Sequence, residues 1–204
     1  MEDIERSGSV GLPPPGWQAR VVDDAGNETP PQAPGELLLE GPHMMSRYYK
    51  SEAATEEVLA GGWLHTGDIA CRDIDGYYYI VGRRKEIIIS GGENIYPQRI
   101  ENFLRQLPGV KDTGVFGLRH CRLGEAVAAQ IELAPGASYT EEEVLDYCQG
   151  LPRFERPLRV FFGPVPRNPT GKIEKQLLQA LYQNEPLPIR RGGPIPGSSQ
   201  ESSP

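Results

Sequence analysis

The apolar and polar positions in the first part of the chain predict short strands joined by turns. Four β-prone runs are predicted as strands: 18–22, 36–40, 69–74 and 77–81. Asp75 and Gly76 lie between the last two runs, and an Asp-Gly pair in that position predicts a β-hairpin. Ser51 suits the N-cap of a short helix that ends at Leu59, before two glycines. This part of the chain is therefore predicted to be rich in β structure.

The second part of the chain mixes strand and helix patterns. Further strands are predicted at 86–89, which should be buried, and at 110–118, 125–133 and 158–162. Pro97 suits the first turn of a helix whose apolar residues recur at helical spacing: Ile100, Phe103, Leu104 and Leu107. Thr140 and Glu143 form a capping-box pattern at the start of the next helix. A final helix follows Lys172, with its apolar face at Ile173, Leu177, Leu178 and Leu181, and ends near Tyr182.

These elements predict an α+β fold in which a β-rich part, residues 1–81, precedes a mixed α/β part, residues 82–182. With 38% hydrophobic residues, the chain can bury a modest core. Residues 183–204 are rich in Pro, Gly and Ser, and burial there does not offset the entropy cost of ordering. We expect that last segment to be disordered.

Charge and cysteine content exclude several classes of function. The chain has 21 Lys and Arg against 28 Asp and Glu, a net charge of -7, which disfavours nucleic acid as a partner. Cys71, Cys121 and Cys148 lie far apart without the spacing of a metal or redox site, so we expect reduced thiols and no metal held by them.

Membrane insertion and secretion are also disfavoured by the sequence. No apolar run approaches the roughly 20 residues that a membrane helix needs. Residues 1–10 are polar and lack the apolar centre of a signal peptide. We therefore expect a cytoplasmic protein with no transmembrane segment.

Three motifs carry the candidate chemistry. Residues 62–68 read Gly-Trp-Leu-His-Thr-Gly-Asp, and residues 166–173 read Pro-Arg-Asn-Pro-Thr-Gly-Lys-Ile. Residues 81–97 read Val-Gly-Arg-Arg-Lys-Glu-Ile-Ile-Ile-Ser-Gly-Gly-Glu-Asn-Ile-Tyr-Pro. Taken singly, each has an ordinary structural explanation, such as a solvated lysine at a helix start or an aspartate in a turn. Their combination and order are much more specific.

Together these motifs resemble the downstream part of the acyl-CoA synthetase and luciferase superfamily of adenylate-forming enzymes. The resemblance is closest to fatty-acyl and aryl-CoA ligases and covers residues 9–182. It implies that a carboxylic acid reacts with MgATP to give an acyl adenylate and pyrophosphate, and that the thiol of coenzyme A then displaces AMP. It also implies that residues 1–81 are the end of a large domain and residues 82–182 a mobile C-terminal domain.

The resemblance assigns the catalytic role to Lys172. Charge gathers around the α-phosphate as the adenylate forms, and a cation on a flexible stem can stabilise it. Lys172 matches the lysine that does this in the family. Gly171 lets the loop bend where a side chain would obstruct.

The resemblance also assigns three residues to the nucleotide. Asp68 matches a carboxylate that accepts hydrogen bonds from the ribose hydroxyls, a task suited to an ionised acceptor. Arg83 matches an arginine that reaches the ribose or phosphate. Ile80 matches an apolar wall beside the nucleotide, although a plain core role is an alternative.

Three further residues match the family positions that serve the second step. Lys85 lies where the family has a hinge, about which the C-terminal domain rotates between the two reactions. Gly91 and Gly92 match a loop that lines the passage for coenzyme A, and glycines permit close approach of the backbone to a narrow ligand. An ordinary hairpin turn would have the same sequence.

Two family features lie outside this sequence, namely the phosphate-binding loop that holds the triphosphate with Mg²⁺, and the acid-binding pocket. We therefore expect the isolated chain to be weakly active or inactive, and the Mg²⁺ to be held by an upstream domain. The chain is expected to be a truncated product, a prepared fragment or one half of a split enzyme. Alternatives are a non-catalytic remnant or interaction module, transfer to a carrier protein, or oxidation of the adenylate as in luciferases.

Overall fold

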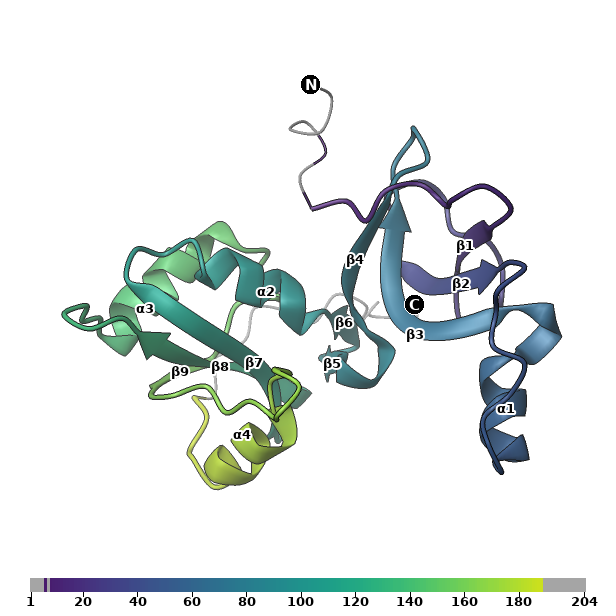
Figure 1. Ribbon diagram of the computed structural model, residues 1–204. Helices are drawn as coiled ribbons and strands as arrows, with labels where there is room; N and C mark the ends of the chain where they lie inside the picture. Colours follow the sequence, from purple (N-terminus) through teal and green to yellow (C-terminus); the bar gives the residue numbers. More distant parts are fainter. Residues whose placement is uncertain (1–5, 7, 189–204) are drawn as a thin grey trace, which may run out of the picture.

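The computed structural model describes residue 6 and residues 8–188, and these form two sheets with four α-helices (Figure 1). We call β1 to β4 with α1 the first unit, and β5 to β9 with α2, α3 and α4 the second unit. The two units lie side by side in Figure 1, with the short strands β5 and β6 between them. The predicted α+β fold is confirmed.

The first unit is an antiparallel sheet in the order β1-β2-β3-β4. Its elements are β1 (Gln18–Val22), β2 (Gly35–Glu40), α1 (Glu52–Val58), β3 (Leu64–Arg72) and β4 (Tyr78–Arg83). A small apolar cluster on this sheet contains Val21, Leu37, Ala70 and Tyr78. The predicted hairpin forms, but β3 begins at Leu64 rather than at residue 69. The motif of residues 62–68 therefore continues into a strand.

The second unit is a mixed sheet in the order β6-β5-β8-β7, with β9 parallel to β8. Its strands are β5 (Ile88–Ser90), β6 (Glu93–Ile95), β7 (Val110–His120), β8 (Gly124–Leu133) and β9 (Arg159–Phe162). Its helices are α2 (Pro97–Leu104), α3 (Glu141–Tyr147) and α4 (Lys175–Tyr182). The predicted capping box is confirmed, since Thr140 and Glu143 bond each other's backbone N–H groups.

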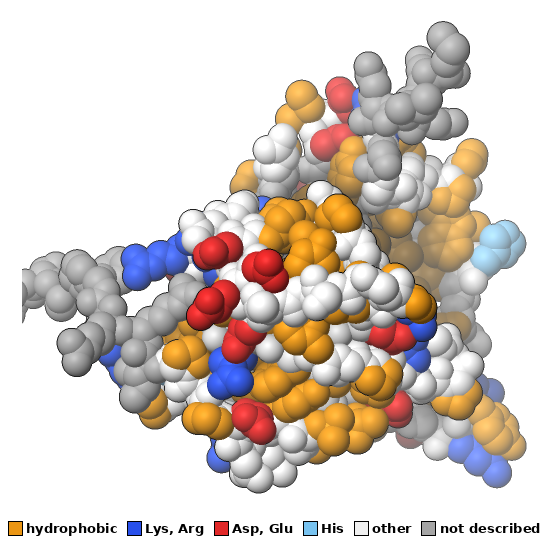
Figure 2. All heavy atoms as spheres, turned by 90° about the vertical axis from the view of Figure 1, so that its left-hand side faces the viewer, with side chains coloured by type: hydrophobic (Ala, Val, Ile, Leu, Met, Phe, Trp, Pro, Cys, Tyr) orange, Lys and Arg blue, Asp and Glu red, His pale blue; other side chains and the backbone are white. Residues whose placement is uncertain are grey.

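The strands of the second unit bury both of their faces because successive side chains point in opposite directions. Val115 and Val127 belong to the cluster that includes Ile100 of α2 and Val144 of α3. Their neighbours in sequence, including Phe116 and Ala128, belong to the cluster with Leu178 of α4. The sheet is thus sandwiched between α2 and α3 on one side and α4 on the other. Figure 2 looks onto this unit, where hydrophobic side chains lie among charged ones.

A close approach of α4 to the sheet depends on Gly114 of β7. A Cβ atom at this position would lie 3.0 Å from Leu178 and 3.2 Å from Ile173. The absence of a side chain therefore lets α4, and the loop that precedes it, sit directly on β7.

Three sequence predictions need correction. Residues 86–89 are not one buried strand: residues 84–86 form a 3₁₀ turn, and Ile88 is buried while Ile89 is exposed, because alternate residues of a strand face opposite sides. Ser51 occupies the N-cap position of α1, but its side chain makes no capping hydrogen bond. Residues 183–188 belong to the described part, and Leu187 packs on the cluster around Leu178. The rest of the segment predicted to be disordered lies outside the described residues.

We predict that Leu178→Ala destabilises the chain by about 2–5 kcal/mol, because it removes a fully buried side chain and leaves a cavity against β7. The measurement is urea unfolding followed by circular dichroism. Leu181→Ala is the matched control, since Leu181 lies on the same helix but is 62% exposed. Equal effects of the two substitutions would contradict the placement of α4.

We also predict selective alkylation of the three cysteines. Burial raises the pKa of the Cys148 thiol to about 11, so its thiolate is scarce near pH 8. Cys121 is exposed. Iodoacetamide at pH 8, read by mass spectrometry, should modify Cys121 first and Cys148 only after denaturation. Early modification of Cys148 would show that the core around α3 opens readily.

Candidate functional site

The loop that carries Lys172 is held in one conformation by Asn168. The Oδ1 atom of Asn168 accepts hydrogen bonds from the backbone N–H of Thr170 at 3.1 Å, from its hydroxyl at 2.7 Å and from the N–H of Lys172 at 2.9 Å. The N–H of Asn168 donates to the carbonyl of Lys172 at 2.9 Å. Gly171 has a φ of 82°, which is why a glycine is required there. Lys172 therefore lies on an ordered turn.

Arg167 fixes this turn to the sheet. Its Nε and Nη2 atoms lie 2.7 and 2.9 Å from the two carboxylate oxygens of Asp112 on β7, and its Nη1 donates to the carbonyl of Gly171. Burial disfavours the charged form of Asp112. The hydrogen bonds from Arg167 and from the N–H of Thr113, and the charges of Arg167 and Arg105, outweigh it and lower the pKa of this carboxyl.

Asp68 and Arg83 are paired across β3 and β4. They are register partners, and Nε of Arg83 lies 2.8 Å from Oδ1 of Asp68. The strand is held by Thr66, whose hydroxyl donates to the carbonyl of Leu37 at 2.7 Å and accepts from the N–H of Asp68 at 3.0 Å. Two residues that were predicted to bind the nucleotide therefore form one ion pair.

An open cleft of about 770 Å³ brings Lys172 of the second unit opposite the first unit. Arg83, Lys85 and Lys172 line it, together with Thr66 and Gly67 of the first motif. Asp68 is not one of its lining residues but contacts Arg83 at its edge. Three predicted site residues from two of the motifs, and two further residues of the third, thus meet at one cleft.

The charges of this cleft favour an anionic ligand. Its lining contains four Lys or Arg side chains, Arg83, Arg84, Lys85 and Lys172, against three acidic ones, Glu36, Glu57 and Glu86. The acids Glu36 and Glu86 are themselves bound to Arg84 and Lys175. Nitrogen donors on Arg83 and Lys172 can therefore bind phosphate or carboxylate oxygens.

The other predicted residues lie elsewhere. Ile80 packs against the apolar cluster of the first sheet and stands opposite Ala70, as expected for a core residue. Gly91 and Gly92 form the turn between β5 and β6, with φ of 62° and 90°, and the N–H of Gly91 donates to the carbonyl of Leu123 at 2.9 Å. The structure does not bring these three residues to the cleft.

A buried acid at the cleft was missed by the sequence analysis. Glu36 on β2 is only 8% exposed, and its Oε2 lies 2.6 Å from Nη1 of Arg84 and 3.2 Å from Nδ1 of His65. Arg84 also contacts Asp24 at 3.0 Å. The signal in the sequence was a charged residue directly before the three leucines of residues 37–39.

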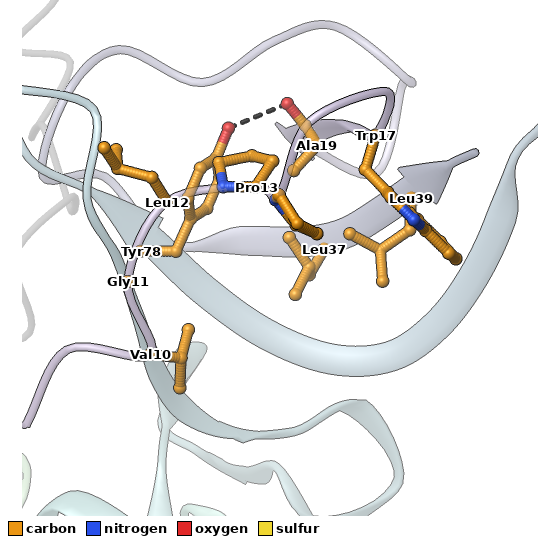
Figure 3. Close-up of a pocket in the computed structure, with 10 residues that line it drawn as sticks. Val10, Gly11, Leu12, Pro13, Trp17, Ala19, Leu37, Leu39 and Tyr78 are labelled. Atoms are coloured by element: carbon orange, nitrogen blue, oxygen red, sulfur yellow. Dashed lines mark hydrogen bonds between the residues drawn. The ribbon is translucent and has the colours of Figure 1, made fainter. Parts of the chain in front are cut away.

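A second hollow, of about 340 Å³, is apolar (Figure 3). It lies between residues 10–14 and the first sheet, and Leu37, Leu39 and Tyr78 contribute to its walls. The hydroxyl of Tyr78 donates to the carbonyl of Ala19 at 2.7 Å. No lining residue of this hollow carries a charge, so it offers no acid or base to a reaction.

The residues that the structure describes contain neither a metal-binding cluster nor a membrane-spanning helix. Within residues 8–188, no three His, Cys, Asp or Glu side chains gather as a metal ion would require. No helix within that range has the length and apolar character to span a bilayer.

Comparison with known proteins identifies the class. The family of AMP-binding enzymes matches residues 1–49, and the AMP-binding enzyme C-terminal domain matches residues 99–172. The chain thus belongs to the AMP-binding, adenylate-forming enzymes and corresponds to their C-terminal portion.

Several of its relatives are CoA ligases. A long-chain-fatty-acid–CoA ligase of Escherichia coli O6:H1 is 41% identical over 180 residues, which are 87% of this chain and 32% of that protein. An indoleacetate–CoA ligase of Aromatoleum aromaticum is 38% identical over 178 residues, which are 86% of this chain and 35% of that protein. The chain thus spans about a third of the length of these relatives.

Solved structures of one relative, with and without ATP, allow a further comparison. ATP-bound MatB from Rhodopseudomonas palustris is 35% identical and aligns with a TM-score of 0.81 over 87% of this chain and 36% of that one. Apo MatB from the same organism is 36% identical and aligns with a TM-score of 0.70 over the same shares. By TM-score, the structure of this chain is closer to the ATP-bound form.

The pH dependence of stability should report the Arg167–Asp112 pair. The pKa of Asp112 is lower in the folded chain than in the unfolded chain. The ionised carboxylate therefore contributes its full stabilisation at pH values above the ordinary aspartate pKa of about 3.9, and this stabilisation is lost as the pH falls through the lowered pKa of the folded state. We predict that wild type is more stable than Asp112→Asn at pH 5 and that the gap closes toward pH 2.

The measurement for this prediction is urea unfolding at a series of pH values. Glu142→Gln is the control, since Glu142 makes no ion pair with any residue that the structure describes. A gap for Asp112→Asn that did not change with pH would contradict the assignment.

Proposed function

We propose that this chain is the C-terminal portion of an ATP-dependent carboxylate–CoA ligase, which forms an acyl adenylate and then a thioester with coenzyme A. The observation that carries the proposal is the cleft where Lys172 from the second unit meets Thr66, Gly67 and Arg83 of the first. A purely structural role of these strand residues would not require a lysine from a distant loop to face them.

Lys172 is assigned to the phosphate. A compact ammonium on a flexible stem stabilises the charge that develops around the α-phosphate during adenylation. The ordered turn around Asn168 holds the backbone of Lys172 while leaving its side chain in the cleft. Such placement before the reaction begins is what makes electrostatic stabilisation effective.

Asp68 and Arg83 are assigned to the ribose and the adjoining phosphate. Their ion pair places an acceptor and a forked donor next to each other, and this combination suits hydroxyl groups beside a phosphate. Ile80 remains assigned to the apolar wall near the nucleotide only through the family likeness, since its side chain packs in the first sheet.

The second step is assigned to a different arrangement of the two units. Lys85 is the proposed hinge, and Gly91 and Gly92 the proposed contact for coenzyme A. The contrast between the two MatB comparisons supports a rotation: identity and coverage are nearly equal, so the difference in TM-score reflects arrangement rather than divergence. ATP and the carboxylic acid come with Mg²⁺ to the upstream part of the protein, which also shapes the acid pocket.

We predict that Lys172→Ala lowers adenylate formation by about 10²–10³, because it removes a cation from the reacting phosphate. The assay mixes the chain with the upstream portion of a related CoA ligase and measures pyrophosphate release from ATP and a fatty or aryl acid. Thioester formation from preformed acyl adenylate should change much less. Lys111→Ala is the matched control, since Lys111 is an exposed lysine of the second unit outside the cleft.

Two results would argue against the proposal. Undiminished adenylation by Lys172→Ala would remove the assigned role. Pyrophosphate release by the chain alone would show that it needs no upstream domain. Calorimetric titration with AMP and coenzyme A completes the test, since AMP binding with no activity in the mixture would favour a non-catalytic binding module.

A further inference from the structure

Two ion-pair systems lie on either side of Lys85 and lead to different units. Before it, Arg84 contacts Glu36 at 2.6 Å and Asp24 at 3.0 Å, both in the first unit. After it, the Oε2 atom of Glu86 lies 2.6 Å from Nζ of Lys175 in α4 of the second unit. Lys85 itself is exposed and forms no ion pair with the residues that the structure describes.

Lys175 is anchored more deeply than a surface lysine. Its side chain is 15% exposed, and its Nζ also lies 3.1 Å from Oε1 of Glu101, whose side chain is 5% exposed. The same Oε1 atom accepts a hydrogen bond from the backbone N–H of Val115 at 3.0 Å. One ammonium therefore joins α4 to α2 and, through Glu101, to β7.

The position of Lys175 connects this anchor with the candidate site. Lys175 is the first residue of α4, directly after the turn that carries Lys172. The turn is fixed on its other side by the bond of Arg167 to Asp112. The segment that follows Lys85 is thus bound to a residue of α4 that lies three positions after Lys172 in the chain.

We propose that Arg84 and Lys175 are positioning residues that confine rotation between the two units to Lys85, and that Lys175 transmits this movement to the turn of Lys172. Arg84 keeps the backbone before Lys85 with the first unit, and Lys175 keeps the backbone after it with the second. The inference rests on the proposed function for the role of Lys172, although the anchors themselves follow from the ion pairs.

A purely structural explanation makes a different prediction. If Lys175 only neutralises the buried carboxylate of Glu101, the contact with Glu86 is incidental, because Glu86 is 44% exposed and an exposed ion pair contributes little. Glu86→Gln would then leave the backbone on both sides unchanged. If the proposal holds, the same substitution loosens two segments that are distant in sequence.

The test is amide hydrogen exchange of the whole chain, read by mass spectrometry. Glu86→Gln should accelerate exchange about two- to fivefold in residues 84–88 and in residues 171–177, with β7 and β8 unchanged. Glu93→Gln is the control, because Glu93 is an exposed acid on β6 with no ion pair to any residue from 8 to 188. Unchanged exchange in either segment of Glu86→Gln would overturn the proposal.

A second pair of variants separates charge from packing. Lys175→Met should accelerate exchange in the same two segments, and Lys175→Arg should restore the wild-type rates, since arginine keeps the cation between the two carboxylates. Failure of arginine to restore them would overturn the role of the ion pairs. Should Lys175→Met fail to fold because Glu101 is left unpaired, Glu86→Gln decides alone.

The exchange experiment on the ion pairs and the test of the proposed nucleotide site can fail independently of each other. Titration of wild type with AMP tests the nucleotide site and does not depend on the anchors. If AMP does not bind but Glu86→Gln loosens both segments, the hinge anchors stand and the assigned ligand is wrong. If AMP binds and exchange is unchanged, the anchors are wrong and the ligand stands.

Discussion

The bond between Arg167 and Asp112 is the interaction on which the candidate site depends most. Fixing the backbone costs about 1–2 kcal/mol per residue, so a glycine-containing loop at the surface keeps one conformation only if its polar groups are bound internally. Arg167 binds both oxygens of Asp112 and also the carbonyl of Gly171. A paired arginine and carboxylate form stronger and more directional bonds than neutral groups do. They hold the turn of Lys172 on β7.

The cleft exists only because two separately packed units face each other. The first unit has a small apolar cluster, whereas the sheet of the second is covered on both faces. Each unit is held by its own core. At the junction, ion pairs join Arg84 to the first unit and Glu86 to the second. Polar contacts exchange readily with water, so such a junction can rearrange while both cores stay intact. Such a junction suits the two successive reactions that we propose.

Local patterns predicted the elements well, and the combination of motifs predicted the site residues that meet at the cleft. The helix from Pro97 follows its apolar spacing, and the capping box at Thr140 is present as predicted, because both depend on neighbours a few residues apart. The partners of the site are distant: Arg167 and Asp112 are 55 residues apart, and Arg84 and Glu36 are 48 apart. No local pattern specifies such pairs. Residues 86–89 were wrongly predicted to be one buried strand for a related reason. A strand whose residues alternate between buried and exposed can have the same apolar composition as a strand that is buried on both faces.

The distance of Gly91 and Gly92 from the cleft fits the proposed two-step reaction. In the proposed function, Lys172 binds the phosphate and the turn of Gly91 and Gly92 contacts coenzyme A. These two parts of the second unit could serve the same cleft only if the second unit rotated between the two steps. By TM-score the structure is closer to ATP-bound MatB than to apo MatB, and in it Lys172 lines the cleft whereas Gly91 and Gly92 do not. Both belong to the second unit: the turn of Gly91 and Gly92 joins β5 to β6, which pair with β8, and the turn of Lys172 is held on β7 by Arg167. In the function that we propose, a rotation of the second unit about Lys85 that brought one of them to the cleft would move the other away from it.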